Sequence, residues 1–171
     1  MKLKFDACSL ILSQKLHLLP LLHDTFGTLY ITSAVNDEVI KQGNKPESAE
    51  KIKEFIDQGL IENIIPRGIL LSSLGKGEGE TLAETKTQKE NGEDAVCVTE
   101  DKKAKKEAIR LNLDVLGLDS LLVEAVLLEK MTEDEFDDEI LALDKIHKLD
   151  ITRISELRRF IRIVTNKKRD E

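Results

Sequence analysis

The chain has 171 residues, of which 40% are hydrophobic and 35% are charged. This length and composition predict one globular domain with a helical extension and a charged surface, and they argue against intrinsic disorder. The 26 Lys and Arg residues and 33 Asp and Glu residues give a net charge of −7, so any contact with nucleic acid must be made by a local basic patch.

The chain shows no pattern of a membrane span or of a zinc site. Its apolar runs are much shorter than the roughly 18 consecutive apolar residues that a spanning helix needs. The basic N-terminus reaches Asp6 before any hydrophobic segment, unlike a signal peptide, so we expect a cytoplasmic protein. Two distant cysteines and three scattered histidines offer no ligand cluster for zinc.

Short apolar runs alternate with helical patterns along the first 130 residues. We predict strands at residues 2–5, 29–32, 61–66, 95–99 and 115–117. We predict helices at residues 7–12, 16–26, 33–41, 47–58, 78–90, 101–111 and 120–130, the third of them capped by Ser33. The run at 95–99 is the best candidate for a central strand, because unbroken apolar runs are typical of strands covered on both faces.

This alternation predicts an α/β fold over residues 1–130, a three-layer α/β/α sandwich with a central parallel sheet. From about residue 131 the pattern is only helical, with an acidic segment at 133–139 followed by helices at 140–147 and 151–164. We therefore expect residues 131–171 to form a C-terminal helical extension packed on the same domain.

Two acids follow predicted strands. Asp6 ends the first strand, and Asp101 stands two residues after the strand at 95–99. In an open parallel sheet the ligand crevice lies beyond the carboxyl ends of the strands, so we expect both acids at one edge. Each acid is also a preferred N-cap for the helix that follows it, which is the alternative explanation.

Two predicted helices add further acids. At 100° per residue, Glu38 falls between Ala34 and Val35, inside the apolar arc of its helix. On the helix at 78–90, Glu78 points inward, whereas Glu80 points nearly opposite. Glu78 is therefore favoured over Glu80 as a site residue, and Glu80 remains the alternative. Taken alone, each acid would be an ordinary surface or first-turn charge.

Four carboxylates in one crevice repel one another unless a cation or raised pKa values relieve the charge. Mg²⁺ and Mn²⁺ prefer oxygen ligands, can lower the pKa of a water molecule and can stabilise the leaving oxygen of a phosphodiester. The sequence contains no GxxxxGK[ST] loop, no GxSxG elbow and no Cys/His nucleophile pair. The acids therefore point to metal-dependent hydrolysis of phosphodiesters.

Four motifs, in the expected order, resemble those of the PIN domain family, the fold of many metal-dependent ribonucleases, including VapC-like toxins. The first is the strand end Phe5-Asp6-Ala7-Cys8-Ser9, and the second is a "pxxVxxE" pattern that closes at Glu38. The third and fourth are Leu74-Gly75-Lys76-Gly77-Glu78-Gly79-Glu80, similar to "LGxGExE", and Val98-Thr99-Glu100-Asp101-Lys102-Lys103-Ala104, similar to "TxDxxA".

The resemblance implies a PIN-like nuclease domain whose catalytic acidic cluster is Asp6, Glu38, Glu78 and Asp101. Asp6, Glu78 and Asp101 would hold Mg²⁺ or Mn²⁺, and Thr99 would support the cluster by orienting a carboxylate or a water molecule. It further implies an endoribonuclease that hydrolyses RNA phosphodiester bonds, the toxin of a toxin-antitoxin pair with an antitoxin protein as partner, and a homodimer.

Basic residues supply candidate RNA contacts. Lys102 and Lys103 follow Asp101 and would steer phosphates, or they form an ordinary solvated helix face. Arg158 and Arg162 lie on a locally basic amphipathic helix, which could follow the RNA backbone or pair with the acidic segment at 133–139.

Two other functions stay open. One is a catalytically inactive PIN fold that acts as an RNA-binding or protein-interaction module. The other is a receiver-like phosphoacceptor domain, which also uses acids at strand ends. The first strand lacks the acid pair of such domains, and no lysine follows the strand at 115–117, so this reading is weaker.

Overall fold

The computed structural model describes residues 1–41, 46–67 and 74–169. The chain divides into two compact units, Met1–Leu118 and Asp119–Glu171, which we call unit 1 and unit 2. The boundary predicted from the sequence, after residue 130, falls inside unit 2. Each unit is described by itself below.

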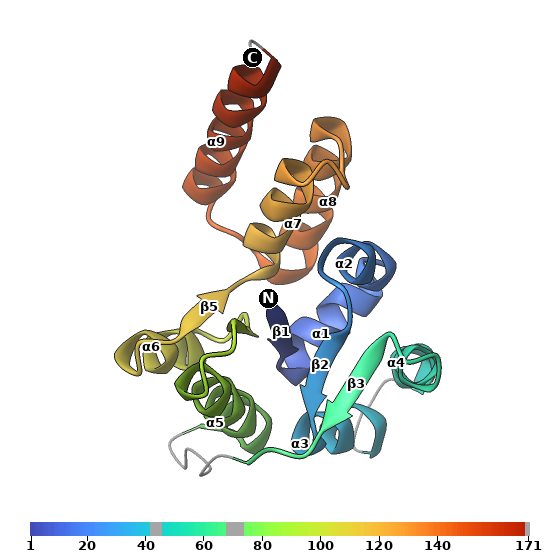
Figure 1. Ribbon diagram of the computed structural model, residues 1–171. Helices are drawn as coiled ribbons and strands as arrows, with labels where there is room; N and C mark the ends of the chain where they lie inside the picture. The colour runs from blue at the N-terminus through green and yellow to red at the C-terminus, as the bar shows by residue number, and fades with distance from the viewer. Residues whose placement is uncertain (42–45, 68–73, 170–171) are drawn as a thin grey trace. The chain divides into compact units, whose positions relative to one another are not determined.

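Unit 1 is built on a five-stranded parallel sheet in the order β3-β2-β1-β4-β5 (Figure 1). The strands are β1 (Lys2–Phe5), β2 (Leu29–Thr32), β3 (Ile61–Ile64), β4 (Ala95–Val98) and β5 (Asp114–Leu116). The predicted α/β class with a parallel sheet is confirmed. Every residue of β4 is buried, as expected for an interior strand, although β1 occupies the middle of the sheet.

Helices cover both faces of this sheet. They are α1 (Ala7–Lys15), α2 (Leu19–Phe26), α3 (Ser33–Asn36), a π-helical turn η1 (Asp37–Lys41), α4 (Pro46–Asp57), α5 (Lys76–Glu90) and α6 (Lys102–Arg110). Helices α1 and α4 pack together on one face, and α5 and α6 pack together on the other (Figure 1). The arrangement is the predicted three-layer sandwich.

A charged side chain lies inside this core. Successive side chains of a strand point to opposite faces, so Leu3 and Phe5 of β1 enter one apolar layer and Lys4 enters the other. Lys4 is fully buried, and its ammonium group has no hydrogen-bond partner within the described part of the chain. Burial lowers the pKa of Lys4 to about 8, and the negative charge of Glu84 partly opposes this effect.

Glu84, on α5, is the buried acid near Lys4. It is 1% exposed and accepts hydrogen bonds from the Gln88 side chain (3.0 Å) and from the backbone N–H of Arg67 (2.8 Å). The Arg67 guanidinium lies 3.7 Å from the same carboxylate. Glu84 therefore ties the segment after β3 to α5, and its negative charge acts on the buried Lys4 of β1.

The start of α3 differs from the prediction. Ser33 does not cap this helix, because Thr32 is the N-cap residue and provides no side-chain cap, and the Ser33 hydroxyl donates instead to the carbonyl of Ile64 (3.4 Å). The backbone N–H of Ala34 donates to the carboxylate of Glu80 on α5 (2.9 Å). A free backbone N–H group at the start of α3 is thus hydrogen-bonded by a residue that is distant in sequence. No local sequence pattern reveals such a contact.

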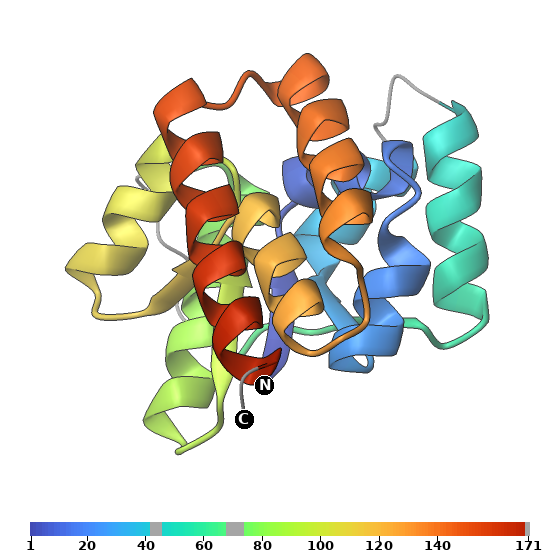
Figure 2. The ribbon, with the colours of Figure 1, turned by 90° about the horizontal axis from the view of Figure 1, so that it is seen from above.

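Unit 2 is helical, as predicted. It contains α7 (Leu118–Leu127), which begins at the unit boundary, followed by α8 (Glu133–His147) and α9 (Ile151–Arg169). The acidic segment and the following apolar segment form one helix, because Thr132 and Glu135 make a capping box at the start of α8. Helices α8 and α9 lie side by side (Figure 2), and their buried residues are Phe136, Ile140, Leu143, Ile154, Leu157 and Ile161.

Within the described residues, no helix is both long enough and apolar enough to cross a membrane.

Candidate functional site

The sheet brings two of the predicted site residues, Asp6 and Thr99, to one place. The strand order reverses at β1, which has β2 on one side and β4 on the other. In such sheets the crevice between the diverging strands, at their carboxyl ends, is the usual ligand site. Asp6 follows β1 directly, and Thr99 follows β4 directly. Although they are 93 residues apart, the Thr99 hydroxyl donates a hydrogen bond to the Asp6 carboxylate.

Asp6 is the most deeply placed acid of this region. Its side chain is 1% exposed, and one carboxylate oxygen accepts a hydrogen bond from the backbone N–H of Ser9 (2.7 Å). Asp6 is therefore the N-cap of α1 and also part of the crevice. Burial raises the pKa of Asp6, the bonds from Thr99 and Ser9 oppose this, and the charge of Glu78 raises the pKa further.

Asp101 is linked to this position through Thr99. The Thr99 hydroxyl, which is fully buried, also accepts a hydrogen bond from the backbone N–H of Asp101 (3.0 Å). The Asp101 side chain is exposed, and one of its oxygens accepts from the backbone N–H groups of Lys103 and Ala104, both at 2.8 Å. Asp101 thus caps α6 at the same edge of the sheet.

Glu38 comes from the π-helical turn η1 and reaches the first turn of α5. A Cβ atom at Gly77 would lie only 2.9 Å from Oε2 of Glu38, so the glycine leaves room for this carboxylate. Desolvation raises the pKa of Glu38, and the charges of Glu78 and Asp6 raise it further. A helical wheel drawn at 100° per residue does not apply to a π-helical turn. The structure nevertheless places Glu38 where the charges of Glu78 and Asp6 raise its pKa.

The structure separates the roles of Glu78 and Glu80. The Glu78 carboxylate lies over Gly75, where a Cβ atom would collide with it, and its charge acts on both Asp6 and Glu38. Glu80 instead accepts the hydrogen bond from Ala34 at the start of α3. The structure therefore brings Glu78 together with Asp6 and Glu38 and gives Glu80 a partner in α3.

This difference predicts distinct effects of two matched substitutions. Glu78→Gln should weaken Mn²⁺ binding at least roughly tenfold, because it removes a charge from the cluster. Glu80→Gln should leave Mn²⁺ affinity unchanged, whereas Glu80→Ala should lower the free energy of unfolding by about 1 kcal/mol through loss of the α3 cap. Calorimetric Mn²⁺ titration and urea denaturation measure these quantities. Equal loss of Mn²⁺ affinity in Glu78→Gln and Glu80→Gln would contradict the assignment.

The donor set fits a hard divalent cation. Asp6, Glu38 and Glu78 offer only carboxylate oxygens. Burial raises the pKa values of Asp6 and Glu38, and the neighbouring carboxylate charges, which a cation would neutralise, raise them further. In the described residues, no three side chains of His, Cys, Asp or Glu are arranged closely enough to hold a metal ion as they stand. Both carboxylate oxygens of Asp6 accept hydrogen bonds from the protein itself. These bonds are one reason why the Asp6 carboxylate is not directed toward a shared metal position with the other acids.

The predicted basic contacts differ in their surroundings. Lys102 and Lys103 are exposed on the first turn of α6, next to Asp101. Arg158 forms an ion pair with Asp137 of α8 (2.6 Å), so Asp137 partly neutralises its charge within unit 2. Arg162 is exposed and lines an open groove on α9.

Sequence reasoning missed the buried pair Lys4 and Glu84. The signal available was a lysine between Leu3 and Phe5 in the short first strand. A second acid in this region, Glu100, has structural partners: it accepts from the backbone N–H of Leu118 (2.6 Å) and from Lys105 (3.0 Å). Glu100 therefore anchors the chain after β5 and is not part of the cluster that we describe.

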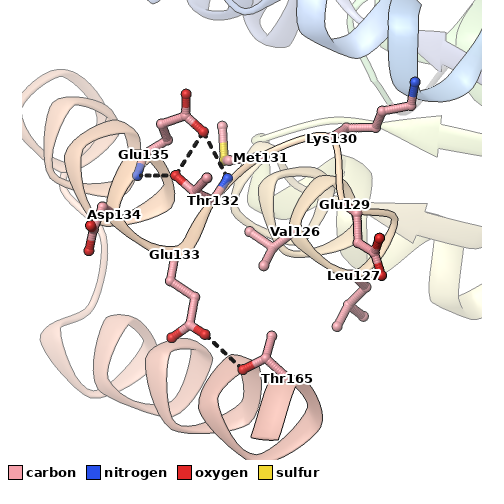
Figure 3. Close-up of a pocket in the computed structure, with 10 residues that line it drawn as sticks. All are labelled: Val126, Leu127, Glu129, Lys130, Met131, Thr132, Glu133, Asp134, Glu135 and Thr165. Carbon is pink, nitrogen blue, oxygen red and sulfur yellow. Dashed lines mark hydrogen bonds between the residues drawn. The ribbon is translucent and has the colours of Figure 1, made fainter. Parts of the chain in front are cut away.

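Unit 2 contains a cavity of about 700 Å³ between the end of α7, the start of α8 and Thr165 of α9 (Figure 3). Two of the acids that line it have structural partners. Glu133 accepts a hydrogen bond from Thr165 (2.8 Å), and Glu135 accepts from the backbone and the hydroxyl of Thr132 (2.8 Å each). These carboxylates stabilise the start of α8 and its contact with α9, so we do not assign a ligand to this cavity.

The comparisons with known proteins agree with the fold. The family model DUF3368, described as a PIN domain, matches residues 3–157. The matched range begins within β1 and includes the other four strands and the four predicted acids. Comparisons with curated proteins and with solved structures return no significant match. Since the family model covers most of the chain and the sheet is the parallel α/β sheet described above, the chain belongs to the PIN domain family.

Proposed function

We propose that this protein is a metal-dependent endoribonuclease that hydrolyses RNA phosphodiester bonds with Mg²⁺ or Mn²⁺. The PIN domain is a nuclease fold. The observation that carries the proposal is the gathering of Asp6, Glu38 and Glu78 at the carboxyl end of the central strand, with the pKa values of Asp6 and Glu38 raised.

In this proposal Asp6, Glu78 and Asp101 hold the cation, and Glu38 completes the acidic cluster. When bound, the cation supplies a lowered pKa for an attacking water and compensates the negative charge that develops on the phosphate. Thr99 orients the Asp6 carboxylate through its hydrogen bond. Glu38, whose pKa is raised, is suited to accept the proton of the attacking water. Lys102 and Lys103 attract the phosphates of the substrate.

The biological role that we propose is that of a VapC-like toxin, a cytoplasmic homodimer with an antitoxin protein as its partner. The support is the resemblance of the four motifs that contain Asp6, Glu38, Glu78 and Asp101. A small gene beside this one, encoding a DNA-binding fold with a flexible tail, would favour this role over that of an RNA-processing enzyme.

A second candidate function is a PIN fold without catalysis that binds RNA or another protein. One observation favours it: as they stand, no three acidic, histidine or cysteine side chains among the described residues are placed to hold a metal ion. This candidate keeps the fold and the basic residues of the nuclease proposal but requires no cation.

Cleavage of a mixed RNA pool by the purified protein distinguishes the two functions. We expect cleavage with Mn²⁺ and none with EDTA, together with Mn²⁺ binding in a calorimetric titration. Cleavage that persists in EDTA would rule out the metal-dependent mechanism. If the RNA stays intact with Mn²⁺ and the titration shows no binding by the folded protein, the non-catalytic function is correct.

A further inference from the structure

Thr32, the last residue of β2, is a buried threonine whose hydroxyl group has no assigned role. Its side chain is 0% exposed, and its Oγ1 atom has no hydrogen-bond partner among the residues that the structure describes. A buried hydroxyl without a partner destabilises a folded protein, so such groups are rare. A role in catalysis or in binding an ion or a water molecule is a common reason for keeping one.

Another residue performs the task that this hydroxyl would ordinarily have. Thr32 is the N-cap residue of α3 and has the extended backbone of such a residue (φ −89°, ψ 166°), but its side chain makes no capping bond. An N-cap threonine normally accepts a hydrogen bond from the N–H two or three residues further on, and Ala34 is two residues further on. The Ala34 N–H donates to the Glu80 carboxylate instead (2.9 Å). Glu80 therefore replaces Thr32 as the cap of α3 and leaves its hydroxyl available.

The register of the sheet places Thr32 beside Asp6. Lys4 of β1 lies level with Tyr30 of β2, so the residues two further along, Asp6 and Thr32, are level and on the same face of the sheet. The register between β1 and β4 makes Thr99 level with Asp6 in the same way. On that side the hydrogen bond from the Thr99 hydroxyl to the Asp6 carboxylate confirms the count.

Asp6 thus lies between two buried threonines that differ in their hydrogen bonds. Thr99 donates to one carboxylate oxygen of Asp6, and the other oxygen accepts from the backbone N–H of Ser9. The Thr32 hydroxyl bonds to neither oxygen. Because neighbouring strands lie only about 4.8 Å apart, this hydroxyl is within reach of a water molecule held at the Asp6 carboxylate.

A hydrated cation has water molecules that such a hydroxyl can bind. Mg²⁺ keeps several of its water ligands in proteins and is usually held by only one or two carboxylates. A threonine hydroxyl can accept a hydrogen bond from one of these water molecules. Groups that orient the ligands of a metal typically contribute 10- to 100-fold to metal affinity or activity.

We propose that Thr32 is a positioning residue of the acidic cluster, and that its hydroxyl binds a water molecule of the hydrated cation at Asp6. This inference rests on the proposed function, because it requires that the cation binds there. It also gives the two acids of the segment Glu78-Gly79-Glu80 different tasks. Glu78 contributes charge to the cluster, and Glu80 keeps the Thr32 hydroxyl out of the α3 cap.

Calorimetric Mn²⁺ titration and urea denaturation of the full chain test this role without RNA. Thr32→Val removes the hydroxyl and keeps the shape of the side chain. We expect the dissociation constant for Mn²⁺ to rise roughly 10- to 100-fold. The free energy of unfolding without Mn²⁺ should stay the same or increase, because a buried hydroxyl without a partner is removed. Thr32→Ser, which keeps the hydroxyl, should restore most of the Mn²⁺ affinity.

The matched control is Thr85→Val, which also removes the hydroxyl of a fully buried threonine. The Thr85 hydroxyl donates to the carbonyl of Thr81 within α5 (2.7 Å), so Thr85→Val should bind Mn²⁺ like the wild type. An unchanged Mn²⁺ affinity in Thr32→Val would overturn the inference. An affinity that falls as far in Thr32→Ser as in Thr32→Val would also overturn it, because the effect would then come from packing and not from the hydroxyl.

A second variant tests the link between Glu80 and Thr32. Glu80→Ala leaves the Ala34 N–H without its acceptor, so the Thr32 hydroxyl should turn to cap α3 and no longer serve the cluster. Glu80→Ala should therefore lower Mn²⁺ affinity as Thr32→Val does, and Thr32→Val/Glu80→Ala should lower it no further. Additive losses in the double variant would contradict this link.

RNA cleavage with Mn²⁺ separates a failure of this inference from a failure of the proposed function. If the wild-type protein binds Mn²⁺ but cleaves no RNA, the nuclease proposal fails, and the titrations still decide the role of Thr32. If cleavage depends on the metal but Thr32→Val binds Mn²⁺ like the wild type, only the inference fails. A wild-type protein that binds no Mn²⁺ would overturn both.

Discussion

Replacing Asp6 by asparagine should reduce Mn²⁺-dependent RNA cleavage at least about 100-fold. Loss of a residue that only supports a metal ligand typically costs 10- to 100-fold in affinity or activity, so loss of a direct ligand should reach the upper end of that range. Asp6 is a buried acid that accepts a hydrogen bond from the Thr99 hydroxyl, and the charge of Glu78 raises its pKa. The measurements are cleavage of an RNA pool and calorimetric titration with Mn²⁺.

The same variant should remain folded. Asparagine keeps an oxygen that can accept from the backbone N–H of Ser9. The pKa of Asp6 is raised in the folded state, so its ionised form destabilises the apo protein near neutral pH, and Asp6→Asn should unfold with an equal or higher free energy. Asp57→Asn, at the exposed end of α4, is the matched control. Full cleavage by Asp6→Asn would remove Asp6 from the site.

The second large effect concerns the buried Lys4 and the pH dependence of stability. In the folded protein the pKa of Lys4 falls from 10.5 to about 8. Between these two pH values the unfolded chain binds a proton that the folded chain has lost, so the free energy of unfolding should increase as pH rises. The gain attributable to Lys4 should be roughly 3 kcal/mol between pH 8 and 10.5. Urea denaturation at several pH values measures it.

Lys4→Met provides the comparison, because methionine fills a similar volume and carries no titrating group. The gain with rising pH should disappear in this variant, whereas Lys53→Met, at an exposed position on α4, should keep it. In Lys4→Met the buried Glu84 loses a nearby positive charge, which lowers the free energy of unfolding, but the desolvation cost of the buried ammonium group also disappears, which raises it. The stability of the variant near neutral pH reflects both effects. A wild-type profile that is flat between pH 8 and 10.5 would show that the ammonium group is not desolvated.

The kind and order of most helices and strands can be predicted from the amino-acid sequence. Strands and helices leave local periodicities of two and about 3.6 residues, and glycines, prolines and caps mark their ends, so each can be read from neighbouring residues. The alternation of these elements then predicted a parallel sheet. It also placed Asp6 and Asp101 at strand ends, where the structure has them as the caps of α1 and α6.

Which side chains meet depends on how the fold packs these elements together. The capping of α3 by Glu80, the bridge from Thr99 to Asp6 and the burial of Lys4 near Glu84 each join residues that are far apart in the chain. The π-helical turn at Glu38 and the pairing of Arg158 with Asp137 likewise depend on neighbouring elements. Local periodicity carries no information about such contacts, because hydrogen bonding and burial depend on which surfaces the fold brings together.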